Sequence, residues 1–210
     1  MKAAVMHERG ARLVVEDVDL ESPRAGEIAV RLVATGVCHS DLNGLRGPRP
    51  LPTPMVLGHE GAGIVESVGA RVTAAAPGDH VVLSAIGRCG RCAACVAGRP
   101  WMCIAWGATI FSGRLLDGTT RLSLRGSPVH HWFAQSSFAE RAVVPEGSVV
   151  KIRAELPLEK AALLACGVST GLGAVFNAAR VSWSRTSTSS RHAPARSRSD
   201  SSRRVSVIAT

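Results

Sequence analysis

Residues 89–103 read CGRCAACVAGRPWMC and hold four of the six cysteines of the chain. The spacing C-x2-C-x2-C-x7-C lets neighbouring thiolates in a turn point at one centre, as a tetrahedral four-sulfur zinc site requires. The expected ligands are Cys89, Cys92, Cys95 and Cys103. An iron–sulfur cluster uses the same ligand type, and disulfide bonds are a third interpretation. Because the run holds no histidine or carboxylate and leaves no open position, we favour a structural zinc ion.

The compartment expected from the sequence supports metal binding. The first residues, MKAAVMHERG, lack the apolar core of a signal peptide, and the longest apolar runs, such as AALLAC at 161–166, are too short to span a bilayer. We therefore expect a cytoplasmic protein without a membrane partner. A reducing cytosol disfavours disulfides and directs clustered thiols toward metal binding or redox chemistry.

Charge and composition divide the chain into two parts. Residues 181–210 hold six arginines, one aspartate and ten serines, so they contribute +5 of the net charge of +9 and leave +4 for the first 180 residues. All 21 glycines lie at or before Gly173. We expect a folded domain at 1–178 and an aberrant, disordered Ser/Arg-rich tail at 179–210, consistent with a lost reading frame. Nucleic acid is not an expected partner, because the only aromatic residue of the tail is Trp183.

Val-rich segments bounded by Gly, Pro or Asp predict short strands separated by tight turns. They read KAAVMHE, ARLVVEDVDL, EIAVRLVATGVC, EGAGIVESVG, DHVVLSAI and SFAERAVVPEGSVVKI. PLEKAALLAC at 157–166 predicts a helix, with Pro157 at its first position and Glu159 in its first turn. The chain is therefore expected to be mainly β with some α, arranged as a compact β-barrel-like domain.

Three residues that are far apart in the sequence form a second candidate metal site. Cys38, His59 and Cys166 offer two thiolates and an imidazole, a zinc ligand set that leaves a fourth position open for water or substrate. Taken singly, each is more often a packed structural residue. Ligands from separate segments nevertheless suit a catalytic site, which is assembled from several elements.

Together these motifs resemble the zinc-dependent medium-chain alcohol dehydrogenases, in particular the liver and glutathione-dependent formaldehyde dehydrogenase type. GHEGAGIVESVGARV at 58–72 is similar to the zinc signature of that family, and the cysteine run is similar to its structural zinc lobe. LLDGTTRLSLRGSPVHHWFAQSSFAE at 115–140 and PLEKAALLACGVSTGLGAV at 157–175 resemble its later segments. The resemblance runs from Met1 to about Val181. It implies a GroES-like catalytic domain with two zinc ions, one catalytic and one structural.

The resemblance also implies roles for individual residues. The implied ligands of the catalytic zinc are Cys38, His59 and Cys166. Glu60 would be a transient ligand, and Asp41 would hydrogen-bond the ligand imidazole. Ser40 would receive the alcohol proton, and His39 would face the cofactor pyrophosphate. The implied reaction is oxidation of an alcohol to an aldehyde or ketone, with hydride transfer to NAD or NADP.

Two departures from the family pattern concern the relay and the pocket. Asn43 stands where some relatives continue the proton relay with a histidine, so the proton leaves by another path or through His39. Trp132 and Phe133 are the candidates for the wall of the alcohol pocket. Ala85 stands where some relatives carry a bulky aromatic residue, which predicts a wider pocket for larger or branched alcohols.

The largest departure concerns the cofactor domain. In the family, a Rossmann domain with a G-x-G-x-x-G turn follows the helix near Asn177. GLGA at 171–174 follows a helix and GAGIVE at 61–66 lacks the third glycine, so neither has the required strand–turn–helix context. We expect the Rossmann domain to be absent or lost, and a catalytically inactive zinc-binding fragment is the alternative function. Relatives form homo-oligomers largely through that domain, so an oligomer is doubtful for this chain.

Overall fold

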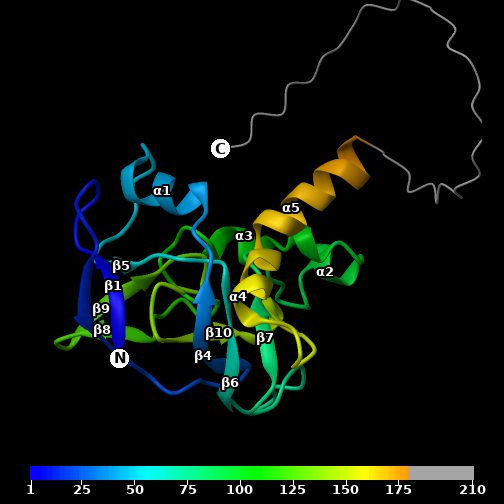
Figure 1. Ribbon diagram of the computed structural model, residues 1–210, viewed down its shortest axis with the longest axis horizontal. Helices are drawn as coiled ribbons and strands as arrows, with labels where there is room; N and C mark the ends of the chain where they lie inside the picture. The colour runs from blue at the N-terminus through cyan, green and yellow to red at the C-terminus, as the bar shows by residue number, and fades with distance from the viewer. Residues whose placement is uncertain (180–210) are drawn as a thin grey trace, which may run out of the picture.

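The computed structural model describes residues 1–179, which fold into two β-sheets and several short helices (Figure 1). The Ser/Arg-rich tail expected at the end of the chain lies outside the described residues, apart from its first position. The prediction of a mainly β domain with some α is confirmed.

The first sheet has six strands in the order β2-β1-β5-β9-β8-β3. Their bounds are β1 (Lys2–Met6), β2 (Val14–Asp17), β3 (Asp19–Leu20), β5 (Met55–Val56), β8 (Leu122–Leu124) and β9 (Ser127–His131). Neighbours are antiparallel except for β5 and β9, which run parallel. This pairing places the segment before His59 beside the strand that leads directly into Trp132 and Phe133.

The second sheet has five antiparallel strands in the order β10-β4-β6-β7-β11. Their bounds are β4 (Glu27–Thr35), β6 (Gly61–Val68), β7 (His80–Leu83), β10 (Arg141–Pro145) and β11 (Val149–Lys151). The glycines of GAGIVE lie inside β6, where a Cβ on Gly63 would meet the Arg31 carbonyl oxygen at 2.1 Å. These glycines allow close strand pairing rather than forming a phosphate-binding turn.

Helical segments lie outside and between the strands. Their bounds are α1 (His39–Arg46), α2 (Ala93–Val96), η1 (Pro100–Met102), α3 (Ile104–Thr109), η2 (Glu146–Ser148), α4 (Leu158–Ala161), η3 (Ala162–Ala165), α5 (Gly167–Gly173) and η4 (Ala174–Ala178). The helix predicted at 157–166 is present but begins one residue later. Pro157 is the extended residue before α4, and its carbonyl accepts the N–H of Ala161. From Ala162 the helix tightens into the 3-10 turn η3.

The helical segment from α4 to η4 starts on the second sheet and then leaves it. Leu158, Ala161 and Ala165 pack against Ala62 and Val82 of the sheet. Beyond them α5 projects away from the body (Figure 1), and the side chains of this projecting part are largely exposed. No single helix in residues 1–179 has the length and apolar character needed to cross a membrane; the helices 158–165 and 167–178 reach them only as a pair bent by 49°.

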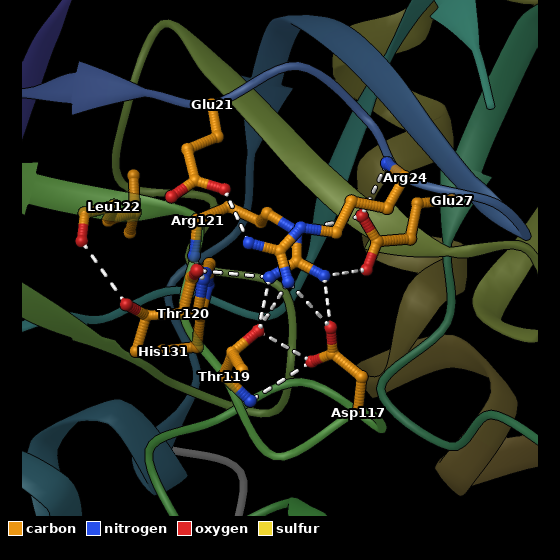
Figure 2. Close-up of polar contacts among 9 residues, drawn as sticks. All are labelled: Glu21, Arg24, Glu27, Asp117, Thr119, Thr120, Arg121, Leu122 and His131. Atoms are coloured by element: carbon orange, nitrogen blue, oxygen red, sulfur yellow. Dashed lines mark hydrogen bonds and ion pairs between the residues drawn. The ribbon is translucent and has the colours of Figure 1, made fainter.

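A buried arginine connects the two sheets (Figure 2). Arg121, just before β8, is 1% exposed, and its guanidinium donates to both carboxylate oxygens of Glu27 at the start of β4. It also donates to Asp117 and to the Thr119 hydroxyl. Its backbone N–H donates to His131 Nε2 over 3.0 Å. This network fixes the end of β9, and so the position at which Trp132 and Phe133 begin.

Candidate metal centres

The four-cysteine site is formed by one continuous loop. The sulfurs of Cys89, Cys92, Cys95 and Cys103 all lie within 4.8 Å of one another. All six cysteines of the chain are free, as the metal-binding interpretations require. Cys103 Sγ accepts the backbone N–H of Cys89 at 3.3 Å and that of Trp106 at 3.4 Å. All four sulfurs therefore come from one loop, which packs against Trp106, Leu115 and Ala134, and this ligand set suits zinc.

Backbone N–H donors lower the pKa of one of these thiols, and burial raises the pKa of another. The backbone N–H groups of Cys95 and Ile104 lower the pKa of Cys92 to about 6, because they stabilise its thiolate. Burial and then the neighbouring Cys92 raise the pKa of Cys95 to about 11. The protein alone thus stabilises only part of the negative charge, and a bound dication is needed to ionise all four sulfurs.

The second site is assembled from three segments. Ligand atoms of Cys38, His59, Glu60 and Cys166 lie within 4.8 Å of one another. Cys38 immediately precedes α1, His59 and Glu60 precede β6, and Cys166 lies between η3 and α5. The structure thus brings together all the residues that the family resemblance implied as ligands, although 128 positions separate the first from the last.

His59 has the environment of a metal ligand. Its side chain is fully buried, its Nδ1–H donates to Asp41 Oδ1 over 2.9 Å, and its ring stacks on Phe133 with centroids 4.5 Å apart. Within residues 1–179, its Nε2 is buried with no hydrogen-bond partner. Because Asp41 accepts the Nδ1 proton, the Nε2 lone pair points freely toward the two cysteines. This donor set fits a zinc ion with one open position.

The two thiols of this site differ in acidity. Burial opposes ionisation of Cys38, but the backbone N–H and hydroxyl of Ser40 outweigh it and lower the pKa of Cys38. Burial and the adjacent Cys38 raise the pKa of Cys166 to about 12. Binding of a dication would therefore release the Cys166 proton.

The Glu60 carboxylate fits beside the other ligands because residue 36 is a glycine. The Glu60 side chain is buried, and a Cβ on Gly36 would lie 1.9 Å from Glu60 Oε2. Any larger residue at position 36 would displace the carboxylate. The glycine thus keeps Glu60 beside the cysteines, as a transient-ligand role requires.

A cavity of about 450 Å3 opens over the second site. Its lining includes Ser40, His59, Ala85, Phe133 and Cys166. A neighbouring cavity of about 340 Å3 shares Ser40 and Phe133 with it and is also lined by Asn43, Arg49, Phe111 and Trp132. Ala85 and Phe133 thus border the space above the ligands, whereas Trp132 lies against the second cavity only. His39 is exposed at the start of α1 and lines neither cavity.

Sequence reasoning missed several residues that shape the site. Gln135 accepts the N–H of Gly61 and donates to the Leu83 carbonyl, so it joins the loop after β9 to both β6 and β7. Phe111 packs against Trp132 and Phe133. No local pattern marks Gln135 or Phe111, because their partners come from distant segments.

Residues 24–154 match the model of the alcohol dehydrogenase GroES-like domain. The chain belongs to this family. The family resemblance and the GroES-like fold expected from the sequence are thereby confirmed.

Relatives of this GroES-like domain are dehydrogenases. The chain is 44% identical over 182 residues to S-(hydroxymethyl)glutathione dehydrogenase of Paracoccus denitrificans, with 86% of this chain and 48% of the relative covered. It is 46% identical over 181 residues to alcohol dehydrogenase class-3 of Drosophila melanogaster, with the same coverage. The chain spans about half the length of the curated relatives it matches.

Two solved structures are similar to the domain. An alcohol dehydrogenase zinc-binding domain protein from Burkholderia ambifaria has a TM-score of 0.80 at 46% identity, covering 84% of this chain and 48% of that one. Benzyl alcohol dehydrogenase from Acinetobacter calcoaceticus has a TM-score of 0.78 at 42% identity, with the same coverage.

Proposed function

We propose that this domain is the catalytic domain of a zinc-dependent alcohol dehydrogenase, which oxidises an alcohol to an aldehyde or ketone and delivers the hydride to NAD or NADP. One observation carries the proposal. The unpartnered Nε2 of His59 is buried beside two cysteine sulfurs, under a cavity that Ser40 also lines. The names of the dehydrogenases to which the chain is similar support the same reaction class.

The residues around the proposed zinc ion have different roles. Cys38, His59 and Cys166 would hold the zinc ion, and Asp41 keeps the proton of His59 on Nδ1 so that Nε2 is free. Zinc at such a site supplies Lewis acidity, which lowers the pKa of a bound hydroxyl group. Glu60, held beside the cysteines, would serve as a transient fourth ligand.

Ser40 is positioned to move the proton of the alcohol. Its hydroxyl is both donor and acceptor, and it lines both cavities. A proton accepted from the first cavity can therefore pass toward the second. Asn43 lines that second cavity but has no basic group to accept the proton. The proton therefore passes to solvent in the second cavity, or leaves through His39. The exposed His39 is available to a cofactor phosphate.

The pocket favours bulky alcohols. Ala85 contributes only a methyl group to the wall of the cavity, and Phe133 contributes an aromatic ring. We expect benzylic or branched alcohols to bind more tightly than ethanol, because they fill more apolar surface. A strong preference for ethanol would contradict this substrate class.

Metal analysis combined with a turnover assay tests the proposal. The purified chain is assayed with benzyl alcohol and NAD or NADP, alongside Ser40→Ala as a matched variant. Zinc binding with turnover that Ser40→Ala reduces about 100-fold would support the enzyme. Bound zinc without turnover in the unmodified chain would instead support a catalytically inactive zinc-binding domain.

A further inference from the structure

Trp132 directs its polar atom at the buried carboxylate rather than into a cavity. Its indole N–H donates to Asp41 Oδ1 over 2.9 Å, and both side chains are almost completely buried. This is the same oxygen that accepts the Nδ1–H of His59, also over 2.9 Å. Trp132 and His59 are therefore linked through one atom.

The remaining donors to Asp41 show what Trp132 adds. The backbone N–H of Cys38 donates to Oδ2 over 3.0 Å, and that of Gly58 donates to Oδ1 over 3.2 Å. These two donors and His59 all come from the ligand segments themselves. Trp132 is the one donor to Asp41, among the described residues, that comes from the scaffold after β9. It ties the orientation of the carboxylate to the first sheet.

Ring packing supports the same connection. Trp132 meets Phe133 edge to face with centroids 4.9 Å apart, and Phe133 stacks on His59. A Cβ on Gly44 would lie 3.1 Å from Trp132 Cζ2, so α1 approaches the indole closely at this glycine. The indole is thus held on two sides, which fixes the direction of its N–H.

We propose that Trp132 is a positioning residue for the Cys38–His59–Cys166 metal site, acting through Asp41 on the imidazole of His59. The proposal rests on the proposed zinc site but not on turnover. Residues that orient a metal-binding histidine commonly contribute 10- to 100-fold to metal affinity. Trp132 therefore controls how strongly the assembled site holds its metal.

The test is a cobalt(II) titration of the full chain in competition with a chelator. The four-thiolate and two-thiolate sites have distinct absorption bands, so each affinity is read separately. Trp132→Phe keeps an aromatic ring and removes the N–H, and we expect about tenfold weaker binding at the assembled site with a shifted visible band. The four-cysteine site serves as an internal reference and should change less than twofold.

Trp106→Phe is the matched control. Trp106 is equally buried, and its indole N–H donates to the Ala85 carbonyl rather than to Asp41, while the backbone N–H that it donates to Cys103 Sγ is kept in the variant. This variant should leave the affinity of the assembled site within about twofold. Equal losses in the two variants would show a general effect of removing a buried indole and would overturn the proposal.

A double-mutant cycle separates positioning from packing. If Trp132 acts through Asp41, Trp132→Phe should have almost no effect on cobalt affinity in an Asp41→Ala background. Additive effects, or an unchanged affinity and band in Trp132→Phe alone, would overturn the proposal. Should Asp41→Ala fail to fold, the band position of the single variant decides, because simple loosening of the fold leaves the ligand field of the bound metal unchanged. Metal binding without alcohol turnover would contradict the proposed function alone.

Discussion

The two metal centres of this domain are built in opposite ways. The four-cysteine site takes all its candidate ligands from residues 89–103, and within residues 1–179 the backbone N–H groups that Cys103 Sγ accepts come from this loop and its immediate continuation. The Cys38–His59–Cys166 site draws on three segments, and its imidazole contacts Asp41 and Phe133, with Asp41 also accepting the indole N–H of Trp132. The first site takes its ligands from one loop, whereas the second needs the fold to bring its ligands together.

Substitution of Arg121, which connects the two sheets, should have the largest effect on the difference between the two sites. Arg121→Met leaves Glu27 buried without its partner, which costs about 3–5 kcal/mol of unfolding free energy. Among folded molecules the assembled site should also bind cobalt more weakly, while the four-cysteine site is unchanged. Urea unfolding and the cobalt titration measure the two effects.

Arg141→Met is the control for that variant. Its partner Glu66 lies 3.2 Å away, but both side chains are substantially exposed, so the loss should stay below about 1 kcal/mol. Equal destabilisation by the two substitutions would show that Arg121 contributes no more than a surface ion pair.

Acid should weaken the scaffold of the assembled site. Complete burial, and then the charge of Arg121, lower the pKa of His131 to about 3. The unfolded chain, with a histidine pKa near 6.5, binds the proton more readily between these values, so stability is full above about pH 6.5 and falls as the pH drops toward 3. Linkage predicts a loss of about 2 kcal/mol from this group between pH 6.5 and 4.5.

His131→Gln isolates that contribution. Glutamine can still accept the Arg121 backbone N–H but does not titrate in this range, so the stability difference between variant and parent should vary with pH by the predicted amount. Burial alone would raise the pKa of Asp117, but Arg121 outweighs it and lowers the pKa to about 2. Asp117 is therefore ionised in the folded chain throughout this window. A difference that stays constant from pH 6.5 to 4.5 would contradict a neutral buried His131.

The smallest effect is expected from the arginines around the cysteine loop. Arg91 is exposed, and its backbone N–H rather than its guanidinium lowers the pKa of Cys89. Because solvent and salt screen exposed charges, Arg91→Gln should change cobalt affinity of the four-cysteine site less than about threefold. A tenfold loss at low salt would show that the side-chain charge supports the loop directly.

The same contrast explains what the sequence could predict. The four-cysteine cluster could be predicted from its spacing, because all four residues lie in one short loop. The strands follow from Val-rich segments bounded by turn residues, and the glycines of GAGIVE fit a strand once β4 lies against them. The assembled site could be inferred only through the family resemblance, since no local pattern joins Cys38 to Cys166.

What the sequence did not reveal depends on contacts between distant segments. Trp132 was predicted at the wall of the alcohol pocket, and the sequence did not indicate that its N–H donates to Asp41, 91 positions away. Likewise, nothing near Arg121 indicates that Glu27, on another sheet, will accept its guanidinium. Such pairings arise from strand order, which the periodicity of single segments does not specify.

The central claim is that the domain holds two separately built metal centres. Elemental analysis of the metal content of the parent chain and of the variants His59→Ala and Cys103→Ala tests it most directly. Two separately built centres predict two zinc ions per parent chain and one in each variant. The remaining ion in each case should give the cobalt spectrum of the undisturbed site. Fewer than two ions in the parent, or loss of both ions from His59→Ala while the chain remains folded, would contradict the account.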